Sequence, residues 1–488
     1  MATQHETLLA ELTARWPEHR IAPSLDRIRA VTELLGDPQR ACPVIQITGT
    51  NGKGSTAIMI EALLRAAGLR TGRYSSPHLV DVTERIAIDG QPISRERFAE
   101  VWADIKPYVE IVDEQQLQGA PMTFFEVLTA MAYAAFADAP VDVMIIEVGL
   151  GGTWDATNIA DAQVAVVMPI DLDHTHILGG TLTEIAGEKA GIIKPGAHAI
   201  LAGQPVEAAK VLLEHCADVG ALVHREGLDF GLLDRKQAVG GQLIRLNGAA
   251  GPVDDIHLPL HGVHMARNAA VALAAVEAFL GLKALPEDLV REGFAEVRAP
   301  GRLEAIRQSP PIVLDGAHNA AAAAASAEAM VEAYSFEPLV GVFAVMADKD
   351  AEAVLRIWEP VMHEIVCTRV ASTDRGLGVD ELVDLAQEVF GPGRVRRADT
   401  IADALDLATT IVDTDAGRPG IIVTGSVIAA GEARALLATD DLVRDVDEID
   451  WDADDHGGTL DELTDGRALD DLRAGGADDL RHGRGDED

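Results

Sequence analysis

The sequence predicts an α/β protein with two mostly parallel sheets, and three observations support this fold class. Its 488 residues are enough for two ordinary domains with full hydrophobic cores. Apolar runs bounded by turn residues alternate with stretches of helix length, which is typical of β-α-β units. The runs are nearly continuous in valine and isoleucine, as strands buried on both faces of a parallel sheet require. We therefore expect domains over residues 1–299 and 300–437, and an acidic tail over 438–488.

The first predicted unit begins with the strand "PVIQIT" (43–48), a glycine-rich loop and the apolar helix "STAIMIEALLRAAG". Two further buried strands are predicted in "VDVMIIEVG" (141–149) and "AQVAVVMPI" (162–170). Between about 205 and 260, short segments punctuated by glycine, such as "VGGQLIRLNG", predict antiparallel strands at the rim of the first domain. A mostly parallel sheet with an antiparallel margin is therefore expected here.

A second set of predicted strands begins near residue 300. These strands lie in "PIVLDGAHN", "PLVGVFAVMADKD", "HEIVCTRV" and "GIIVTGSV", and helical stretches rich in Ala, Leu and Glu separate them. We place the domain boundary at "VRAPGRLEAI", because Pro300 and Gly301 break the helical pattern before them.

The last fifty residues differ in composition from the rest of the chain. Residues 440–488 include 19 acidic and 5 basic residues. Such a segment buries too little apolar surface to offset its chain entropy, so a disordered, solvating tail is expected. The alternative is a weak amphipathic helix that binds a partner. Its apolar residues would be Leu460, Leu463, Leu469 and Leu472.

Charge and cysteine usage exclude several classes of protein. The net charge of −39 argues against a nucleic-acid-binding protein, which needs a basic surface. No apolar run reaches the ~18 residues that a membrane span requires, and the N-terminus does not resemble a secretory signal. Cys42, Cys216 and Cys367 are far apart and form no C-x-x-C pair, which favours buried thiols in a reducing compartment. We expect a cytoplasmic monomer that binds neither membranes nor nucleic acids.

The loop "GTNGKGST" (49–56) indicates a nucleotide site, although it departs from the usual pattern G-x-x-x-x-G-K-[ST]. Gly54 stands where a hydroxyl residue normally follows the lysine, and Ser55 comes one position late. A buried strand precedes the loop and an apolar helix follows it, which a flexible linker would lack. Backbone N–H groups at the start of that helix, together with Lys53, would bind phosphates.

Polar residues also follow other strands of the first domain, where ligands of parallel sheets bind. Glu147 ends an apolar strand, where it is either a magnesium-organising carboxylate or an ordinary strand-end charge. The loop "DLDHTHILGG" contains His174 and His176, but a zinc site would lack a third ligand at a familiar spacing. A histidine beside magnesium, or a plain polar loop, is favoured instead. Further along, "TEIAGEKAGIIKPG" places Glu184, Glu188 and Lys189 on a short helix before a turn, and the local sequence alone indicates surface charge.

The second domain repeats this arrangement. "LDGAHNA" brings Asp315, His318 and Asn319 to a strand end, and "ADKD" (347–350) does the same for a second cluster. Two domains whose strand ends both carry polar groups predict a cleft between them, with ATP on one side and a second substrate on the other.

Nine motifs in order resemble the folylpolyglutamate synthase and dihydrofolate synthase family of the Mur ligase superfamily, and they cover about residues 20 to 430. They are "ITGTNGKGS", "SSPHL", "MTFFE", "EVGLGGTWDATN", "DHTHILG", "EIAGEKAGIIK", "HMARNAA", "GRLE" and "LDGAHN". The resemblance implies a P-loop-type N-terminal domain, a Rossmann-like C-terminal glutamate-ligase domain and an active site between them. In this family the phosphate loop resembles a shortened Walker A with glycine after the lysine, so the late Ser55 is normal.

The resemblance implies an ADP-forming ligase that adds L-glutamate to dihydropteroate and to folates. ATP would phosphorylate a carboxylate, and the amine of glutamate would attack the acyl phosphate. Two Mg²⁺ ions would assist, one of them bound to N-carboxylated Lys189. A folylpolyglutamate synthase without the first activity is the alternative within the family. A P-loop regulatory NTPase is the alternative from another class.

The resemblance also assigns roles to individual residues. ATP would be bound by Thr50, Asn51, Gly52, Lys53, Gly54, Ser55, Thr56, Asn268, Arg302 and Asp315. Magnesium would be bound by Ser76, Glu147, His174 and Lys189 as its carbamate. Folate or pterin would contact Ser75, His78, Thr123, Phe124 and Asp155, and glutamate would contact His318 and Ser426. The residues expected to act in catalysis are Lys53, His174, Lys189, Asp315 and His318.

The chain departs from the family pattern at one position in these motifs. The family commonly has Arg-Leu after "GLGG", and Thr153 and Trp154 replace them here. The replacement removes a cation near the expected folate and metal region.

Overall fold

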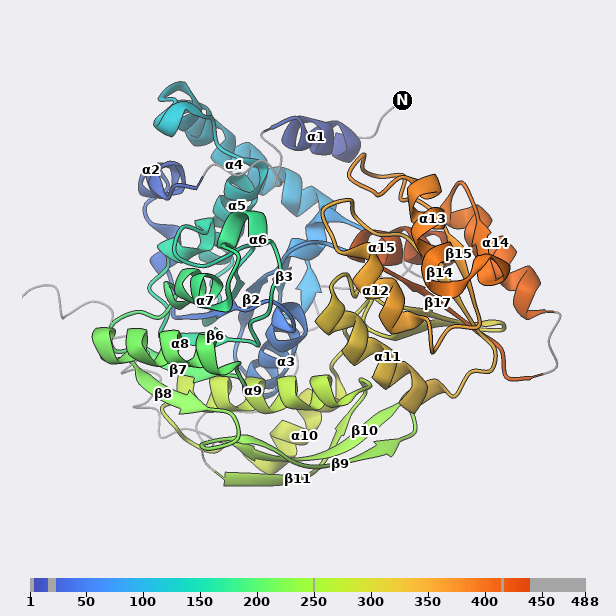
Figure 1. The fold of residues 1–488 in the computed structure, drawn as a ribbon. Helices are drawn as coiled ribbons and strands as arrows, with labels where there is room; N and C mark the ends of the chain where they lie inside the picture. Colours follow the sequence, from blue (N-terminus) through green and yellow to red (C-terminus); the bar gives the residue numbers. More distant parts are fainter. Residues whose placement is uncertain (1–3, 16–22, 249–250, 414–416, 439–488) are drawn as a thin grey trace, which may run out of the picture.

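The computed structural model describes residues 4–15, 23–248, 251–413 and 417–438 (Figure 1). Its largest sheet has eight strands in the order β4-β3-β2-β5-β1-β6-β7-β8. These strands are β1 (Val44–Thr48), β2 (Thr71–Tyr74), β3 (Ile86–Ile88), β4 (Gln91–Pro92), β5 (Val143–Glu147), β6 (Val164–Val167), β7 (His198–Leu201) and β8 (Leu222–Arg225). All neighbours from β2 to β8 pair in parallel, and only β3 and β4 pair antiparallel. The predicted mostly parallel sheet is confirmed.

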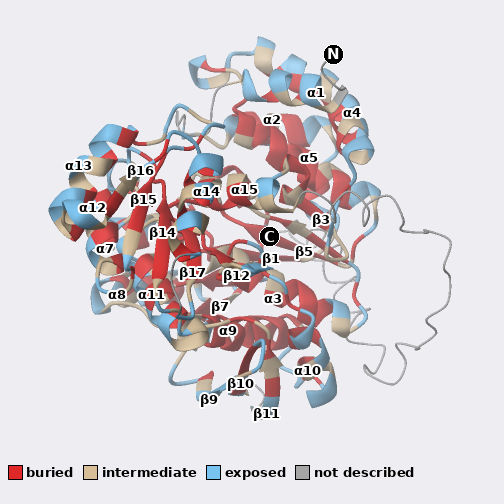
Figure 2. Cartoon of the chain, turned by 90° about the vertical axis from the view of Figure 1, so that its right-hand side faces the viewer, coloured by how far each residue is buried: buried red, intermediate tan, exposed pale blue. Residues whose placement is uncertain are grey.

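Helices cover both faces of this sheet because its strands are apolar on both sides. Every residue of β1 and β5 is buried, and along β5 Val143 and Ile145 face one core while Met144 and Ile146 face another (Figure 2). The first core includes α3 (Lys53–Ala66), α9 (Val263–Phe279) and α10 (Glu287–Ala295). On the other face lie α1 (Gln4–Thr13), α2 (Asp26–Leu34), α4 (Arg95–Glu114), α5 (Phe124–Asp138), α7 (Leu182–Ala190) and α8 (Val206–Val219), while the short α6 (Thr175–Leu178) precedes α7.

The segment 205–260 differs in part from the prediction of antiparallel strands. Its first part is helix α8, followed by β8, which joins the edge of the main sheet in parallel. Its remainder forms the predicted antiparallel strands β9 (Gly231–Ala238), β10 (Gly241–Gly248) and β11 (Gly251–Leu258), which make a separate sheet under α9. The prediction of strands is wrong at α8, because the glycines on which it rested come only after this helix.

A second α/β unit follows, on the right of Figure 1. Its six strands run in the order β12-β13-β17-β14-β15-β16, and all pairs except β12–β13 are parallel. The strands are β12 (Glu304–Gln308), β13 (Pro311–Leu314), β14 (Leu339–Phe343), β15 (Glu364–Cys367), β16 (Val395–Arg397) and β17 (Gly420–Thr424). One face packs on α11 (Ala320–Tyr334), α12 (Ala351–Trp358) and α13 (Val379–Phe390), and the other on α14 (Ile401–Val412) and α15 (Val427–Leu437).

Two sequence predictions concern the limits of these units. The boundary predicted at residue 300 stands four residues before β12 begins. The tail predicted from residue 438 lies outside the described residues, apart from its first residue. Among the helices that the structure describes, none combines the length and apolar character that crossing a membrane would need.

Candidate active site

The phosphate loop follows β1 and leads into α3. Gly52 has φ of 85°, a left-handed conformation that glycine adopts readily, and Lys53 begins the helix. The Lys53 ammonium donates to the carbonyl oxygens of Gly49 and Thr50, each at 3.2 Å, so it lies folded over the loop. The first N–H groups of α3 have no partner within the helix, which makes this end suitable for phosphate.

Of four predicted nucleotide-binding residues, Asn268, Ser55 and Thr50 make side-chain hydrogen bonds at this loop, and Thr56 does not. Asn268 on α9 donates from Nδ2 to Ser55 Oγ at 3.1 Å and lies against Gly52. The Thr50 hydroxyl accepts from the Asp171 N–H at 2.9 Å, which ties the loop to the segment after β6. The Thr56 side chain is fully buried and contacts Met168 Sδ, so its hydroxyl faces the core rather than the loop.

A buried carboxylate lies next to the loop. Glu147, at the end of β5, is 4% exposed, and a Cβ on Gly54 would be only 3.5 Å from its Oε2. The Ser76 N–H donates to the same oxygen at 3.3 Å. Burial raises the pKa of Glu147, and the positive charge of Lys53 opposes this shift. A buried carboxylate facing a phosphate loop is suited to a hard cation.

Asp173, in the loop before α6, connects the two domains. Its Oδ1 accepts from the Lys349 ammonium at 2.5 Å, and its Oδ2 accepts from Asn319 Nδ2 at 3.1 Å. Asn319 also exchanges two amide hydrogen bonds with Asn51 of the phosphate loop, at 3.0 and 3.2 Å. Although burial raises the pKa of Asp173, the neighbouring His174 and the Lys349 ammonium lower it overall. The loops of the two sheets therefore meet at one ionised carboxylate.

His174 and Lys189 lie on the first-domain side of this cluster. Burial lowers the pKa of His174 to about 4, so its imidazole is neutral at neutral pH. Lys189, near the end of α7, is 4% exposed and donates from Nζ to the Gly49 carbonyl at 2.9 Å. Burial, followed by the charge of Lys53, lowers the pKa of Lys189 to about 7. Lys189 is therefore a buried amine beside the phosphate loop, and the interpretation of its local sequence as surface charge is wrong.

The predicted residues of the second domain follow β13 and β17. Asp315 is buried and accepts from the N–H groups of Leu303 and Ala317, at 3.2 and 3.1 Å. His318 donates from Nδ1 to the Gly316 carbonyl at 3.0 Å, and its Nε2 lies 3.7 Å from Asp173.

Two further second-domain residues were predicted to bind ligands. Arg302 donates to the Gly301 carbonyl at 3.0 Å, and Gly316 lies against its guanidinium. Ser426 is 2% exposed, and its hydroxyl caps α15 by accepting from the Ala429 N–H at 3.0 Å. The contacts of Ser426 therefore do not bring its side chain to the cluster.

The predicted folate residues form two groups. Arg85 donates from Nε to His78 Nδ1 at 2.9 Å and lies over the Phe124 ring, 5.4 Å from its centroid. Ser75 Oγ accepts from Arg73 Nη1 at 2.9 Å. One arginine therefore joins two of the predicted residues.

Thr123 and Asp155 make up the second group, and both have structural roles. Thr123 caps α5 in a capping box with Glu126. Asp155 is 3% exposed and accepts from the N–H groups of Leu150 and Thr157, at 2.9 and 3.0 Å.

Asp173 and Lys349 lie in this cluster but were not among the predicted site residues. Asp173 stood beside His174 in the quoted loop, but the metal role was given to the histidine alone. Lys349 lies in the "ADKD" segment, which was predicted as a second polar cluster at a strand end. Applying the strand-end rule to both sheets at once would have suggested that these opposite charges meet.

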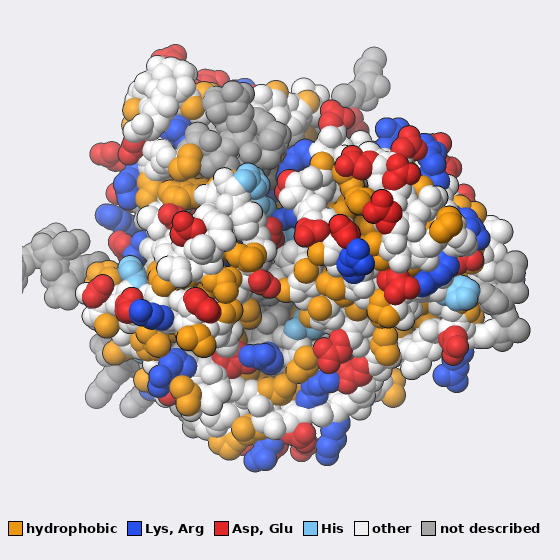
Figure 3. Space-filling view, viewed as in Figure 1, with side chains coloured by type: hydrophobic (Ala, Val, Ile, Leu, Met, Phe, Trp, Pro, Cys, Tyr) orange, Lys and Arg blue, Asp and Glu red, His pale blue; other side chains and the backbone are white. Residues whose placement is uncertain are grey.

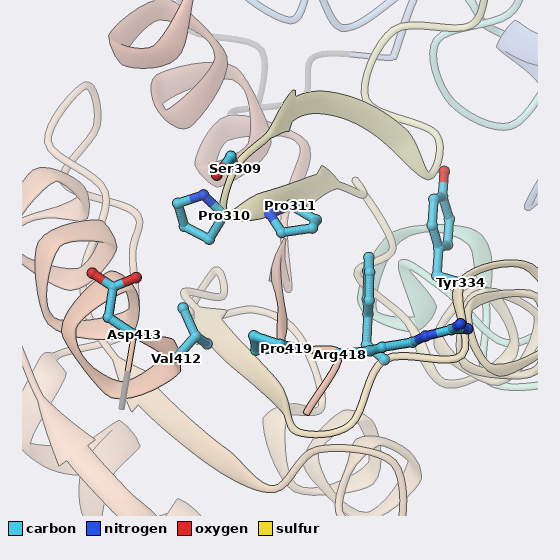
Figure 4. A pocket seen from close by; sticks show the side chains of 9 residues that line it. Ser309, Pro310, Pro311, Tyr334, Val412, Asp413, Arg418 and Pro419 are labelled. Carbon is cyan, nitrogen blue, oxygen red and sulfur yellow. The ribbon is translucent and has the colours of Figure 1, made fainter. Parts of the chain in front are cut away.

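The surface is hollowed along the junction of the two domains (Figure 3). A separate open pocket lies on the second domain, lined by Ser309, Pro310, Pro311, Tyr334, Phe336, Val412, Asp413, Arg418 and Pro419 (Figure 4). Pro311 and Pro419 stand at the amino-terminal ends of β13 and β17, whereas the site residues follow the carboxyl-terminal ends. This pocket is therefore not part of the candidate site.

Comparison with known proteins agrees with this geometry. Residues 47–276 match the Mur ligase middle domain, and residues 301–427 match the Mur ligase glutamate ligase domain. A dihydrofolate synthase/folylpolyglutamate synthase of Mycobacterium tuberculosis is 48% identical over 453 residues, covering 88% of this chain and 93% of that protein. Its Escherichia coli namesake is 35% identical over 386 residues, with 79% and 85% coverage.

Solved structures give the same result. The M. tuberculosis folylpolyglutamate synthase complexed with ADP superposes with a TM-score of 0.86 at 48% identity, covering 89% of this chain and 98% of that one. E. coli FolC in complex with DHPP and ADP has a TM-score of 0.77 at 31% identity, with 90% and 98% coverage. The expected family is confirmed: the chain belongs to the dihydrofolate synthase/folylpolyglutamate synthase family of ATP-dependent Mur-type ligases.

Proposed function

We propose that this chain adds L-glutamate to dihydropteroate and to folate polyglutamates at the expense of ATP. The observation that carries the proposal is the meeting of the phosphate loop, the buried Glu147 carboxylate and second-domain residues around Asp173. A ligase of two substrates and ATP needs groups from both domains at one point, because the phosphoryl donor, the acceptor carboxylate and the incoming amine must be aligned.

The reaction has two steps in this proposal. An acceptor carboxylate oxygen attacks the γ-phosphorus of ATP, which gives an acyl phosphate and releases ADP. The neutral amine of glutamate then attacks the carbonyl carbon, a proton leaves the nitrogen, and phosphate departs to leave an amide. Lys53 and the first N–H groups of α3 hold the phosphates, and Asn268, Arg302 and Asp315 hold the rest of the nucleotide. His318 orients the glutamate from the second domain, whereas the capping role of Ser426 gives its assignment no support.

Magnesium fits the residues present on the first-domain side. Glu147 supplies a carboxylate, Ser76 a hydroxyl and His174 a neutral imidazole. Among the described residues no group of three or more His, Cys, Asp or Glu side chains is arranged to hold a metal. This sparse donor set suits Mg²⁺, which proteins commonly bind through one or two carboxylates together with substrate phosphates. When bound, the ion neutralises charge on the transferring phosphate.

Carboxylation of Lys189 fits the chemistry of that side chain. A buried amine with its pKa near 7 is substantially neutral at neutral pH, and only the neutral amine reacts with CO₂. The Nζ lone pair of the neutral amine forms a bond to the carbon of CO₂ and one proton is released, which converts the amine into an anionic oxygen ligand. Lys189 then supplies the oxygen donor that a second magnesium ion requires.

The acceptor would bind beside Ser75, His78 and Phe124. The alternative is a folylpolyglutamate synthase alone, and one observation favours it. Thr123 and Asp155, the expected pterin contacts, already serve as caps of α5 and of the turn Ala156–Ile159. The cytoplasmic location and the monomeric state stay predictions from the sequence.

The proposal is tested by ADP release from purified protein with Mg-ATP and L-glutamate, comparing dihydropteroate with tetrahydrofolate. We expect turnover on both acceptors and none without glutamate. Turnover on tetrahydrofolate alone would establish the alternative and withdraw the pterin contacts. ATP hydrolysis at a rate that does not depend on the acceptor or on glutamate would overturn the proposal.

A further inference from the structure

The loop between β5 and the turn Ala156–Ile159 holds the end of helix α7. Thr153 donates twice to the Glu188 carbonyl oxygen, from its backbone N at 2.9 Å and from its hydroxyl at 3.1 Å. Glu188 immediately precedes Lys189 in α7. The loop that departs from the family pattern is thus attached to the backbone that carries the buried lysine.

Asn158 closes the same attachment from the other side. Its side-chain Nδ2 donates to the carbonyl oxygens of Thr153 and Gly191, both at 3.1 Å. Asn158 is 6% exposed, so its amide replaces water for two carbonyls that would otherwise be unsatisfied. One amide therefore links the loop to the residue two positions after Lys189.

The two backbones approach so closely that only glycine fits at the contact. A Cβ on Gly152 would lie 2.6 Å from the Glu188 carbonyl oxygen, and one on Gly191 would lie 2.7 Å from the Thr153 Cα. The contact therefore fixes the backbone on both sides of Lys189, whose ammonium reaches the Gly49 carbonyl at 2.9 Å.

We propose that Asn158 and Thr153 are positioning residues that hold the last turn of α7, so that the Lys189 side chain is presented to the phosphate loop. Neither residue needs to touch a substrate, because both act through the backbone carbonyls of Glu188 and Gly191. The proposal rests on the function proposed above for Lys189, and it gives Thr153 a role at the position where the family has arginine. A buried catalytic amine tolerates little displacement, since misplacement by about 1 Å is costly to a reaction.

The test compares Asn158→Leu and Thr153→Val with two controls. Leucine keeps the branched shape of asparagine but is larger and has no donor, and valine replaces only the threonine hydroxyl with a methyl group. Thr153→Ser keeps that hydroxyl. Asn247→Leu removes a β10 amide that donates to the Asp229 carbonyl, at 3.3 Å. Measurements are the melting temperature, kcat, KM for tetrahydrofolate, the Mg²⁺ concentration for half-maximal activity, and the ¹³C carbamate signal in labelled bicarbonate.

For Asn158→Leu we expect kcat to fall and the Mg²⁺ concentration for half-maximal activity to rise. The two changes multiplied together should amount to about 10- to 100-fold, as when a residue that orients a metal ligand is lost. KM for tetrahydrofolate should stay within about twofold, and the carbamate signal should weaken. Thr153→Val should show a smaller change of the same kind, while both controls match the wild type. Because Thr153 is exposed, its valine variant keeps the test valid if Asn158→Leu fails to fold.

Two results would overturn the positioning role. One is an unchanged kcat and Mg²⁺ requirement in both test variants. The other is a loss confined to KM for tetrahydrofolate, which would mean that these residues contact the acceptor. A wild-type enzyme without any carbamate signal would instead refute carboxylation of Lys189. The positioning role would then be judged on kcat alone, by comparing Thr153→Val with Thr153→Ser.

Discussion

At Glu147, the effect of a substitution on turnover can be separated from its effect on the stability of the fold. Its carboxylate is buried, and its hydrogen bond comes from the Ser76 N–H rather than from a cation. Burial raises the pKa of this acid above its unfolded value. The folded protein therefore binds more protons than the unfolded chain between the two pKa values. Stability consequently falls as the pH rises through that range.

For Glu147→Gln we expect turnover to fall by at least about 100-fold, because an amide oxygen neutralises no cation. Without magnesium or nucleotide, the variant should melt at a higher temperature than the wild type at pH 7, and this advantage should shrink toward pH 4. Thermal unfolding from pH 4 to 8, together with ADP release, checks both parts. Near-wild-type turnover would remove Glu147 from the proposed metal site.

At the scale of elements, the edge of the main sheet contains a histidine pair. His198 on β7 and His224 on β8 are joined by a ring nitrogen contact of 3.0 Å. Burial lowers the pKa of both histidines. The charge of His224 lowers the pKa of His198 further, whereas the charge of Asp229 opposes the shift at His224. Since the unfolded chain binds protons more readily, the stability of this edge is present above about pH 6.5 and is lost as the pH falls below it.

We therefore predict that amide hydrogens of β8 exchange faster at pH 5 than at pH 7 after correction for intrinsic rates, while those of β1 do not. His224→Gln should remove most of this difference, because glutamine can hydrogen-bond but does not titrate in this range. Hydrogen exchange with mass spectrometry checks the prediction. An equal acceleration in β1 and β8 would point to global rather than local loss of stability.

Elements were predictable where the sequence pattern is local. The strands around residues 45, 145 and 165 are continuous apolar runs followed by polar residues, so both their existence and the site edge could be expected. Residues 206–219 were assigned wrongly, since only the glycines after α8 shaped the expectation. The partner of β8 was not predictable, because pairing depends on the sheet and not on four residues.

The site, like the fold, could be predicted only where the sequence pattern is local. The phosphate loop and Glu147 could be predicted from local pattern together with family resemblance. Neither loop alone predicts that Asp173 and Lys349 pair, because 176 residues separate them and only the docking of the two domains brings them together.

At the scale of the whole molecule, the acidic tail and the folded body should be separable. Residues 440–488 carry a net charge of −14 and lie outside the motifs that identify the family. A chain ending at residue 439 should keep kcat and both substrate KM values within about twofold, because no site residue is lost. Steady-state kinetics of both proteins at equal concentration test this. A large loss would assign the tail a role in catalysis.

Domain closure should depend on Asp173 more than on any single hydrophobic contact. Its carboxylate receives the Lys349 ammonium and the Asn319 amide, both from the second domain, and the Asp173 and Lys349 side chains are 10% and 9% exposed. Removing one partner of such a pair leaves an unpaired charge, which costs about 3–5 kcal/mol when burial is complete. Asp173→Asn should destabilise the closed arrangement more than Lys349→Met, because Asp173 accepts from both second-domain donors and Lys349 is only one of them.

The double variant separates this contact from a direct role in chemistry. If the pair holds the domains together, Asp173→Asn with Lys349→Met should be more stable than the sum of the single effects predicts, by about 0.5–3 kcal/mol. Small-angle scattering should show a larger radius of gyration for Asp173→Asn than for the wild type without ligands. Strict additivity with an unchanged radius would mean that the domains close without this bridge. A loss of turnover would then have to come from the position of Asp173 beside His174.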